Sequence, residues 1–394
     1  MPVYLDHAAT TVIYDHVVEA MAAQQRLVGN PSSLHTAGRA ARRVVEESRE
    51  RLAAALGARP SEVIFTSGGT ESDNLAVTGI FRARRDEDPR RTRIVVSAVE
   101  HHAVLDCVEA LAGRDGATLT WVPSDPDGQI HATAVRDAIE ADPSSVALVT
   151  VMWANNEVGT VNDVPAIAEV AQAFGVPFHV DAVQAVGHLP VDMTACGADA
   201  LSLSGHKVGG PGGTGALLVR RERELVPLTY GGGQERQIRS GTIDTAGVLG
   251  LSLAVEYAVA RVDEEADRLA RLRDAIIDGA LALDRGIVAG GVWKSGDVEH
   301  RLPGNAHLIV PGCEGDSLLY LLDAAGIECS TGSACQAGVP QPSHVLLAMG
   351  LDETAARGAL RVTCGHTTTD GDVAAFLAAL PAAVDRARRA AGTA

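Results

Sequence analysis

The feature that most constrains the fold is an alternation of short β-branched segments with helical segments over residues 62–181. Strands are expected over residues 63–65, 93–97, 118–122, 147–152 and 176–180. Helices are expected from residue 71 onward and over residues 102–111, 131–140 and 164–174. Such alternation is typical of βαβ units, in which a helix connects two parallel strands. The sequence therefore predicts an α/β fold with a mainly parallel sheet between helices.

A different pattern follows Gly247, beginning with a long amphipathic helical segment expected from residue 248 to about residue 283, with no strand inside it. A loose region at 285–304 comes next, and then alternating strands (306–310, 327–330, 359–363) and helices (316–325, 342–349, 370–391). This second pattern indicates a smaller α+β lobe, which the N-terminal residues can join because chain ends often meet. We therefore expect a large domain over residues 15–250 and a small domain made of residues 1–14 and 251–394.

Composition excludes several classes of function. The formal net charge of -17 argues against direct nucleic-acid binding, because phosphates require a basic protein face. No apolar run is long enough to span a bilayer, and the N-terminal segment lacks a secretory signal, so we expect a cytoplasmic protein with no membrane role. The six cysteines form no C-x-x-C pair, so no zinc-ribbon or other metal site is predicted and most should be free thiols.

A single lysine lies in an unusual setting, between two apolar strands expected at residues 199–203 and 214–219. The stretch Ser204-Gly205-His206-Lys207 and the glycines after it place this lysine in a loop at the tip of a buried sheet. An ammonium group is costly to bury, and a Schiff base with a carbonyl compound is one reason to place a lysine there. A surface lysine on a hairpin loop is the alternative, and this stretch alone does not decide between them.

Two glycine-rich segments raise the question of phosphate binding. Residues 67–70 (Ser-Gly-Gly-Thr) lead into a helix, where backbone N–H groups can hold an anion, although a simple helix cap explains the same pattern. Residues 210–215 match G-x-G-x-x-G, but they run into a strand and not into a helix. The dinucleotide interpretation fails for that reason, and there is no Walker-type G-K-[ST].

Further polar residues fall at the ends of expected strands. Asp181 ends one strand and can pair with a protonated ring nitrogen or cap the next segment. His101 lies in Glu100-His101-His102 and can bind a metal or stack on a flat cofactor. Arg361 lies in a short strand-like run, where its guanidinium can bind a substrate carboxylate, although arginines on edge strands are common.

Cys335 is the second distinctive residue. Its neighbours over residues 330–339 are mostly Ser, Gly, Ala and Thr, which offer a thiol no apolar packing. This environment suits an exposed thiol on a mobile loop, which is a liability unless the protein uses it. A plain surface cysteine is the alternative.

Together these residues resemble the cysteine desulfurases, within the class V aminotransferase group of pyridoxal-phosphate enzymes. The matching stretches are residues 4–11, 29–31, 65–74, 100–104, 155–159, 179–184, 204–207, 231–236, 239–242 and 330–335. They cover nearly the whole chain in order, and the Gly-Ser-Ala-Cys form of the last one resembles the NifS/IscS branch with its long cysteine loop, here about residues 328–342. The resemblance implies the pyridoxal-phosphate aminotransferase-like fold (fold type I), with a large and a small lobe.

The resemblance also implies a role for each residue toward pyridoxal 5'-phosphate. Lys207 would hold the cofactor as a Schiff base and then move protons, Asp181 would pair with the ring nitrogen, and His101 would stack on the ring. Gln184 would bond the phenolic oxygen. The phosphate would be held by Gly69, Thr70, Ser204 and His206, and by Thr242 of a second subunit, which implies a homodimer.

The substrate roles follow from the same resemblance. Asn156, close to the cofactor, and Arg361 would bind the carboxylate of L-cysteine, and Cys335 would take the sulfur as a persulfide and release L-alanine. The persulfide would pass to an acceptor, of which an iron–sulfur scaffold is favoured, with tRNA thiolation and DNA phosphorothioation left open. The departures from the family pattern are Gln336 and Ala337 after the cysteine, and His366 after Gly365.

Two alternatives remain. A selenocysteine lyase or another pyridoxal-phosphate β-lyase would use the same cofactor, although the long cysteine loop argues against strict selenium specificity. A scaffold that has lost catalysis would keep the fold, but the presence of Lys207, Asp181, His101 and Cys335 argues against it.

Overall fold

The computed structural model describes residues 2–332 and 342–392, and its centre is a seven-stranded sheet. The strand order is β2-β8-β7-β6-β5-β3-β4, and all neighbours are parallel except β8, which is antiparallel to both β2 and β7. The strands are β2 (Val63–Thr66), β3 (Arg93–Ser97), β4 (Thr118–Val122), β5 (Val146–Thr150), β6 (Phe178–Asp181), β7 (Ala200–Ser204) and β8 (Gly215–Val219). The prediction of an α/β fold with a mainly parallel sheet is confirmed.

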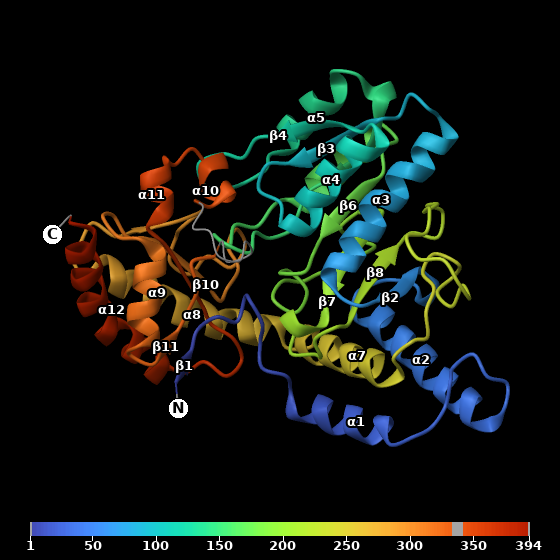
Figure 1. The fold of residues 1–394 in the computed structure, drawn as a ribbon, viewed down its shortest axis with the longest axis horizontal. Helices are drawn as coiled ribbons and strands as arrows, with labels where there is room; N and C mark the ends of the chain where they lie inside the picture. The colour runs from blue at the N-terminus through green and yellow to red at the C-terminus, as the bar shows by residue number, and fades with distance from the viewer. Residues whose placement is uncertain (1, 333–341, 393–394) are drawn as a thin grey trace.

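Helices cover both faces of this sheet because successive strand residues point in opposite directions. Ile64 packs with helices α3 and α4, whereas its neighbours Val63 and Phe65 pack with helices of the other face, which include α2 and α5–α7. The helices of this part are α1 (Asp15–Gln25), α2 (Thr36–Ala55), α3 (Gly69–Glu87), α4 (His102–Asp115), α5 (Ala132–Glu140), α6 (Val164–Ala173) and α7 (Thr245–Val259). Figure 1 shows them around the sheet.

A second part has its own hydrophobic core, in which Leu5 and Phe376 are fully buried. Its antiparallel sheet has the order β12-β10-β9, and the N-terminal strand β1 runs parallel to β11, with Val3 opposite Ile327. Its elements are β1 (Val3–Tyr4), α8 (Val262–Leu281), β9 (Val288–Ala289), β10 (Asn305–Ile309), α9 (Gly315–Asp323), β11 (Ile327–Glu328), β12 (Ala359–Thr363) and α12 (Asp370–Ala391). Helices α10 (His344–Ala348) and α11 (Glu353–Arg357) come between β11 and β12 in the chain, but their buried residues Val345, Leu346 and Ala356 pack with the core of the seven-stranded sheet. The domain boundaries expected from the sequence stay a prediction, because α10 and α11, which that prediction assigns to the small domain, pack with the first core.

The helical segment expected over residues 248–283 is confirmed and contains no strand, but it consists of two helices, α7 and α8, which meet at a bend of 73°. Arg261 leaves the helical conformation at the bend, and its guanidinium lies 4.1 Å from the centre of the Tyr257 ring. Asp263, Glu264 and Glu265 then open α8, where the helix dipole favours acidic side chains. Within the described ranges no single helix has the length and apolarity needed to cross a membrane, although this bent pair meets both criteria when its two helices are taken together.

Candidate functional site

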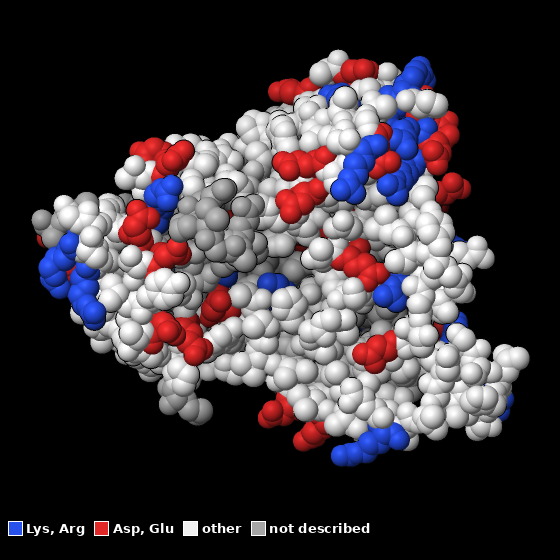
Figure 2. Space-filling view, viewed as in Figure 1, with Lys and Arg blue, Asp and Glu red and all other residues white. Residues whose placement is uncertain are grey.

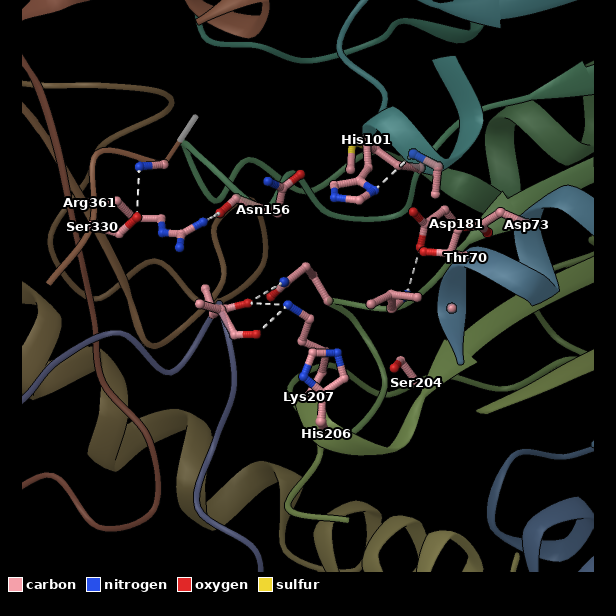
Figure 3. A pocket seen from close by; sticks show the side chains of 18 of the residues that line it. Thr70, Asp73, His101, Asn156, Asp181, Ser204, His206, Lys207, Ser330 and Arg361 are labelled. Atoms are coloured by element: carbon pink, nitrogen blue, oxygen red, sulfur yellow. Dashed lines mark hydrogen bonds between the residues drawn. The ribbon is translucent and has the colours of Figure 1, made fainter. Parts of the chain in front are cut away.

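A cavity of about 400 Å³ lies between the two parts of the molecule, at the carboxyl ends of β6 and β7. Parallel sheets commonly bind ligands at this edge. Figure 2 shows the hollow on a face that carries many acidic side chains, and Figure 3 shows the residues inside it. The predicted site residues that line the cavity are Gly69, Thr70, His101, Asn156, Asp181, Gln184, Ser204, His206, Lys207 and Arg361.

Lys207 enters the cavity from a short 3-10 turn, Gly205–Lys207, that follows β7 directly. The turn is tight, since a side chain at Gly205 would place its Cβ 2.6 Å from the carbonyl oxygen of Pro211. The Nζ of Lys207 donates hydrogen bonds to the backbone oxygens of Ala8 (2.7 Å) and Ala9 (2.8 Å). The lysine therefore faces the cavity and the N-terminal segment, and the hairpin-surface alternative does not describe it.

Asp181 is the last residue of β6 and is 4% exposed. Its Oδ1 accepts a hydrogen bond from the backbone N–H of Val183 at 2.9 Å. Burial, and then the nearby carboxyl of Asp73, raise the pKa of Asp181 to about 7. A cationic N–H group placed beside Asp181 would stabilise its carboxylate form, so the site is suited to a protonated ring nitrogen.

His101 is the N-cap residue of α4, and its ring lines the cavity. The Nδ1 atom accepts a hydrogen bond from the backbone N–H of Ala103 at 3.1 Å, which places the proton of the neutral ring on Nε2. Burial and the charge of Lys207 lower the pKa of His101 to about 4. The ring is therefore neutral at physiological pH, as stacking on a cationic ring would favour. The described residues contain no His, Cys, Asp or Glu group able to hold a metal ion.

The N-terminus of α3 forms the anion-binding side of the cavity. The helix begins at Gly69, and Gly68 before it has a φ of 147°, a conformation that favours glycine. A Cβ at Gly69 would lie 2.7 Å from Cγ2 of Val183, so the backbone approaches closely here. Ser204 and His206 line the same cavity, and burial followed by the charge of Lys207 lowers the pKa of His206 to about 4.

Arg361 extends from β12 on the opposite wall and is 4% exposed. Its guanidinium donates to the backbone oxygen of Asn156 at 3.0 Å and to Oδ1 of Asp6 at 2.9 Å. Its Nε is buried and has no hydrogen-bond partner among the described residues. These contacts fix the guanidinium plane beside Asn156, where a carboxylate can be bound by two N–H groups.

Two predicted residues are not part of this cavity. Thr242 is exposed and does not line it. Cys335 lies outside the described residues, although Ser330 and Gly332, which lead toward it, line the cavity wall. The roles of Thr242 and Cys335 therefore stay predictions.

Sequence reasoning missed several lining residues, above all Asp6 and Asp73. Both lie in stretches that match the family pattern, but nothing in their spacing distinguishes them from surface or capping carboxylates. Ala8 and Ala9 were missed as well, because they act through backbone oxygens that side-chain chemistry does not reveal.

The groups in the cavity fit pyridoxal phosphate. The cofactor needs an amine for its aldehyde, an anion for its ring nitrogen and N–H donors for its phosphate. The amine of Lys207, the buried carboxyl of Asp181 and the start of α3 supply these in one cavity. A side chain at Gly69 would collide with Val183, another lining residue, so the start of α3 keeps its place in the cavity wall only with glycine there.

Comparison with known proteins agrees with the fit of this cavity to pyridoxal phosphate, and the matches extend over nearly the whole chain. Residues 3–376 match the model of the family described as aminotransferase class-V. The chain is 58% identical over 388 residues to the IscS-like cysteine desulfurase of Mycobacterium tuberculosis, covering 98% of each protein. A solved NifS-like protein superposes with a TM-score of 0.89 at 33% identity, over 98% of this chain and 100% of that one. A structure described as SspA in complex with cysteine gives 0.78 at 34% identity, over 91% and 98%.

Matches of this length and strength, together with a cavity whose groups suit the cofactor that the family implies, lead to one assignment: the chain belongs to the aminotransferase class-V family, among its NifS/IscS-type cysteine desulfurases.

Proposed function

We propose that this protein removes sulfur from L-cysteine, releases L-alanine and carries the sulfur as a persulfide on Cys335 until an acceptor takes it. The observation that carries the proposal is the meeting of the Lys207 amine and the Asp181 carboxyl in one cavity, with Arg361 on the opposite wall. The solved relative that contains cysteine supports the choice of substrate.

Each cavity residue has a place toward pyridoxal phosphate in this proposal. Lys207 would hold the aldehyde carbon, Asp181 the ring nitrogen, Gln184 the phenolic oxygen and His101 the ring face. The phosphate would lie at the start of α3, between Gly69, Thr70, Ser204 and His206, where helix N–H groups favour an anion. When bound, the cofactor supplies an electron sink that lets the C–S bond of the substrate break.

The chain's own residues would then orient the substrate and move its protons. Arg361 and Asn156 would bind the substrate carboxylate, which fixes the direction of its side chain. The Lys207 amine would take and return protons, and the Nε2–H of His101 would donate a hydrogen bond beside it. The Cys335 thiolate would attack the substrate sulfur, so that one S–S bond forms as the C–S bond breaks. A proton delivered to the β-carbon would complete alanine.

We also propose a homodimer in which Thr242 reaches the phosphate of the partner subunit. Large apolar side chains stand unusually exposed in the segment between α1 and α2: Leu27 is 68%, Val28 89% and Leu34 88% exposed. Exposed apolar groups of this kind often mark a protein–protein contact. Sedimentation analysis tests this proposal, and a monomer at micromolar concentration would contradict it.

The persulfide needs an acceptor, and we propose a protein that builds iron–sulfur clusters, in the cytoplasm. The support is the IscS-like name of the mycobacterial relative. Trapping the persulfide enzyme and identifying the co-expressed protein that removes its sulfur tests this proposal directly.

The experiment that tests the cofactor site uses the fact that the chain contains two lysines, Lys207 and Lys294. Borohydride reduction of the holoenzyme fixes the cofactor to the lysine that holds it, and peptide mapping then locates it. We expect the label on Lys207, no label in Lys207→Ala, and normal labelling of Lys207 in Lys294→Ala. Label on Lys294, or none on either lysine in the wild type, would refute the site.

A further inference from the structure

Asp73, a second carboxyl residue, lies beside Asp181 at the floor of the cavity. It belongs to α3, is 1% exposed, and lines the same cavity as Asp181. Figure 3 shows it near Thr70 and Asp181. None of the roles proposed above uses Asp73, and a buried carboxyl without a role needs a physical explanation.

The surroundings of Asp73 provide no cation for it. Its Oδ1 accepts no hydrogen bond from any residue that the structure describes. The Nε2 atom of His179 lies 3.5 Å from Oδ1 of Asp73, whereas charge-assisted N–H···O bonds are about 2.7–2.9 Å long. Burial lowers the pKa of His179 to about 4, so this ring is neutral. Asp73 is therefore not half of an ion pair.

The contacts of His179 supply a chain of hydrogen bonds in which a protonated Asp73 fits. Nδ1 of His179 lies 2.9 Å from Oγ1 of Thr150, and Nε2 lies 2.9 Å from Oγ of Ser202. The Ser202 hydroxyl also forms a hydrogen bond with the Asp73 carboxyl, which lowers the pKa of Asp73 against the larger effect of burial. If Asp73 carries a proton, its O–H donates to Ser202, Ser202 donates to His179 Nε2, and His179 Nδ1–H donates to Thr150. Asp73, Ser202 and His179 then each donate one hydrogen bond within this chain.

Burial and the presence of a second buried carboxyl favour the same state. Asp181 and His179 face it from β6, Glu100 from the loop after β3 and Cys107 from α4, and Lys207 follows β7. Burial raises the pKa of Asp73 to about 7, and the pKa of Asp181 also to about 7. Two neighbouring buried carboxyls cannot both ionise cheaply, so one of them retains a proton.

We propose that Asp73 keeps a proton in the holoenzyme, so that Asp181 alone carries the negative charge beside the cofactor ring nitrogen. The inference rests on the proposed function, which places that nitrogen at Asp181. Asp73 is then a positioning residue. It acts on the cofactor ring only through Asp181, because the hydrogen-bond chain that it forms with Ser202 and His179 stays neutral. The proton resides on a carboxyl oxygen of Asp73 and is not consumed in the reaction.

Infrared spectroscopy tests the protonation state directly, without measuring turnover. Holoenzyme is prepared with ¹³C-carboxyl-labelled aspartate, so that a neutral-acid C=O band that shifts with the label comes from an aspartate and not from Glu100. We expect such a band near neutral pH in the wild type, its loss in Asp73→Asn, and its retention in Asp316→Asn, which removes a carboxyl from α9. The absence of the band in the wild type, or its full retention in Asp73→Asn, would overturn the proposal.

Cofactor affinity gives a second readout, followed by visible absorbance. Asn is neutral and has the shape of the protonated acid, so Asp73→Asn should bind pyridoxal phosphate within about threefold of the wild type near pH 7, whereas Asp181→Asn should bind at least about tenfold more weakly. A loss of about tenfold or more in Asp73→Asn would show that its negative charge is needed, and the proposal would fall. Unchanged binding in Asp181→Asn would instead refute the ring-nitrogen site, whatever the infrared result for Asp73.

Discussion

Gly69 at the start of α3 is expected to tolerate no side chain while the cofactor is bound. In Gly69→Ala the added Cβ would lie 2.7 Å from Cγ2 of Val183 and 3.5 Å from Cβ of Ser204. Carbon atoms not bonded to each other prefer about 3.5–4.0 Å, so Val183 must move. Because Val183 lines the cavity, its movement changes the shape of the cavity in which we propose that the cofactor binds.

The size of the effect follows from overpacking, which costs about 1–3 kcal/mol at a well-packed position. If that cost falls on the bound state, the dissociation constant of pyridoxal phosphate rises about 5- to 150-fold, at about 1.4 kcal/mol per factor of ten. The assay is titration of apoprotein with the cofactor, followed by visible absorbance.

Gly113→Ala is a matched control, because Gly113 lies inside α4 and a Cβ there would meet no atom within 4 Å. We expect this variant to bind the cofactor normally and to gain about 0.5–1 kcal/mol of unfolding free energy, since alanine is the better helix former. The reasoning is refuted if Gly69→Ala binds the cofactor as tightly as the wild type does.

Three further predictions concern other parts of the structure. Glu235 is 1% exposed and binds Arg49 through two hydrogen bonds of 2.7 Å, so Glu235→Gln should lower the unfolding free energy by about 3 kcal/mol in urea titrations; a loss below about 1 kcal/mol would contradict this. Arg361→Lys removes the planar guanidinium, so KM for L-cysteine should rise at least about tenfold in steady-state assays, and an unchanged KM would rule out carboxylate binding at this residue. Burial raises the pKa of Asp181 from 3.8 to about 7, so in the apoprotein this carboxyl favours folding while protonated, and that contribution is lost as pH rises from about 4 to about 7. Unfolding free energies of apo Asp181→Asn should therefore fall less than those of the wild type across this window, and an equal fall would show that Asp181 is not the source.

The sequence predicts the sheet well because its strands are short, buried and separated by helices. Val95 and Val149 belong to such strands, and both are fully buried in the structure. The bend between α7 and α8 could not be predicted, because apolar residues recur at helical spacing on both sides of Arg261. Two helices that meet at a bend and one straight helix show the same spacing of apolar residues along the sequence.

In the candidate site, too, the sequence predicts some residues and not others. Lys207 and Asp181 were predictable because a charged side chain at the end of an apolar strand calls for an explanation. Asp73 was not, since an acidic residue in the first turns of a helix is usually there to favour the helix dipole. Only the packing of α3 against β6 and β7 shows that this carboxyl is buried beneath the cavity.

The most direct test of the whole account is a single turnover of the holoenzyme with L-cysteine, followed by mass spectrometry of its cysteine-containing peptides. The account predicts one alanine released for each sulfur atom added to Cys335, and no sulfur bound to the enzyme in Cys335→Ser. Alanine formed with the sulfur on another cysteine, or an undiminished yield of bound sulfur in Cys335→Ser, would contradict it.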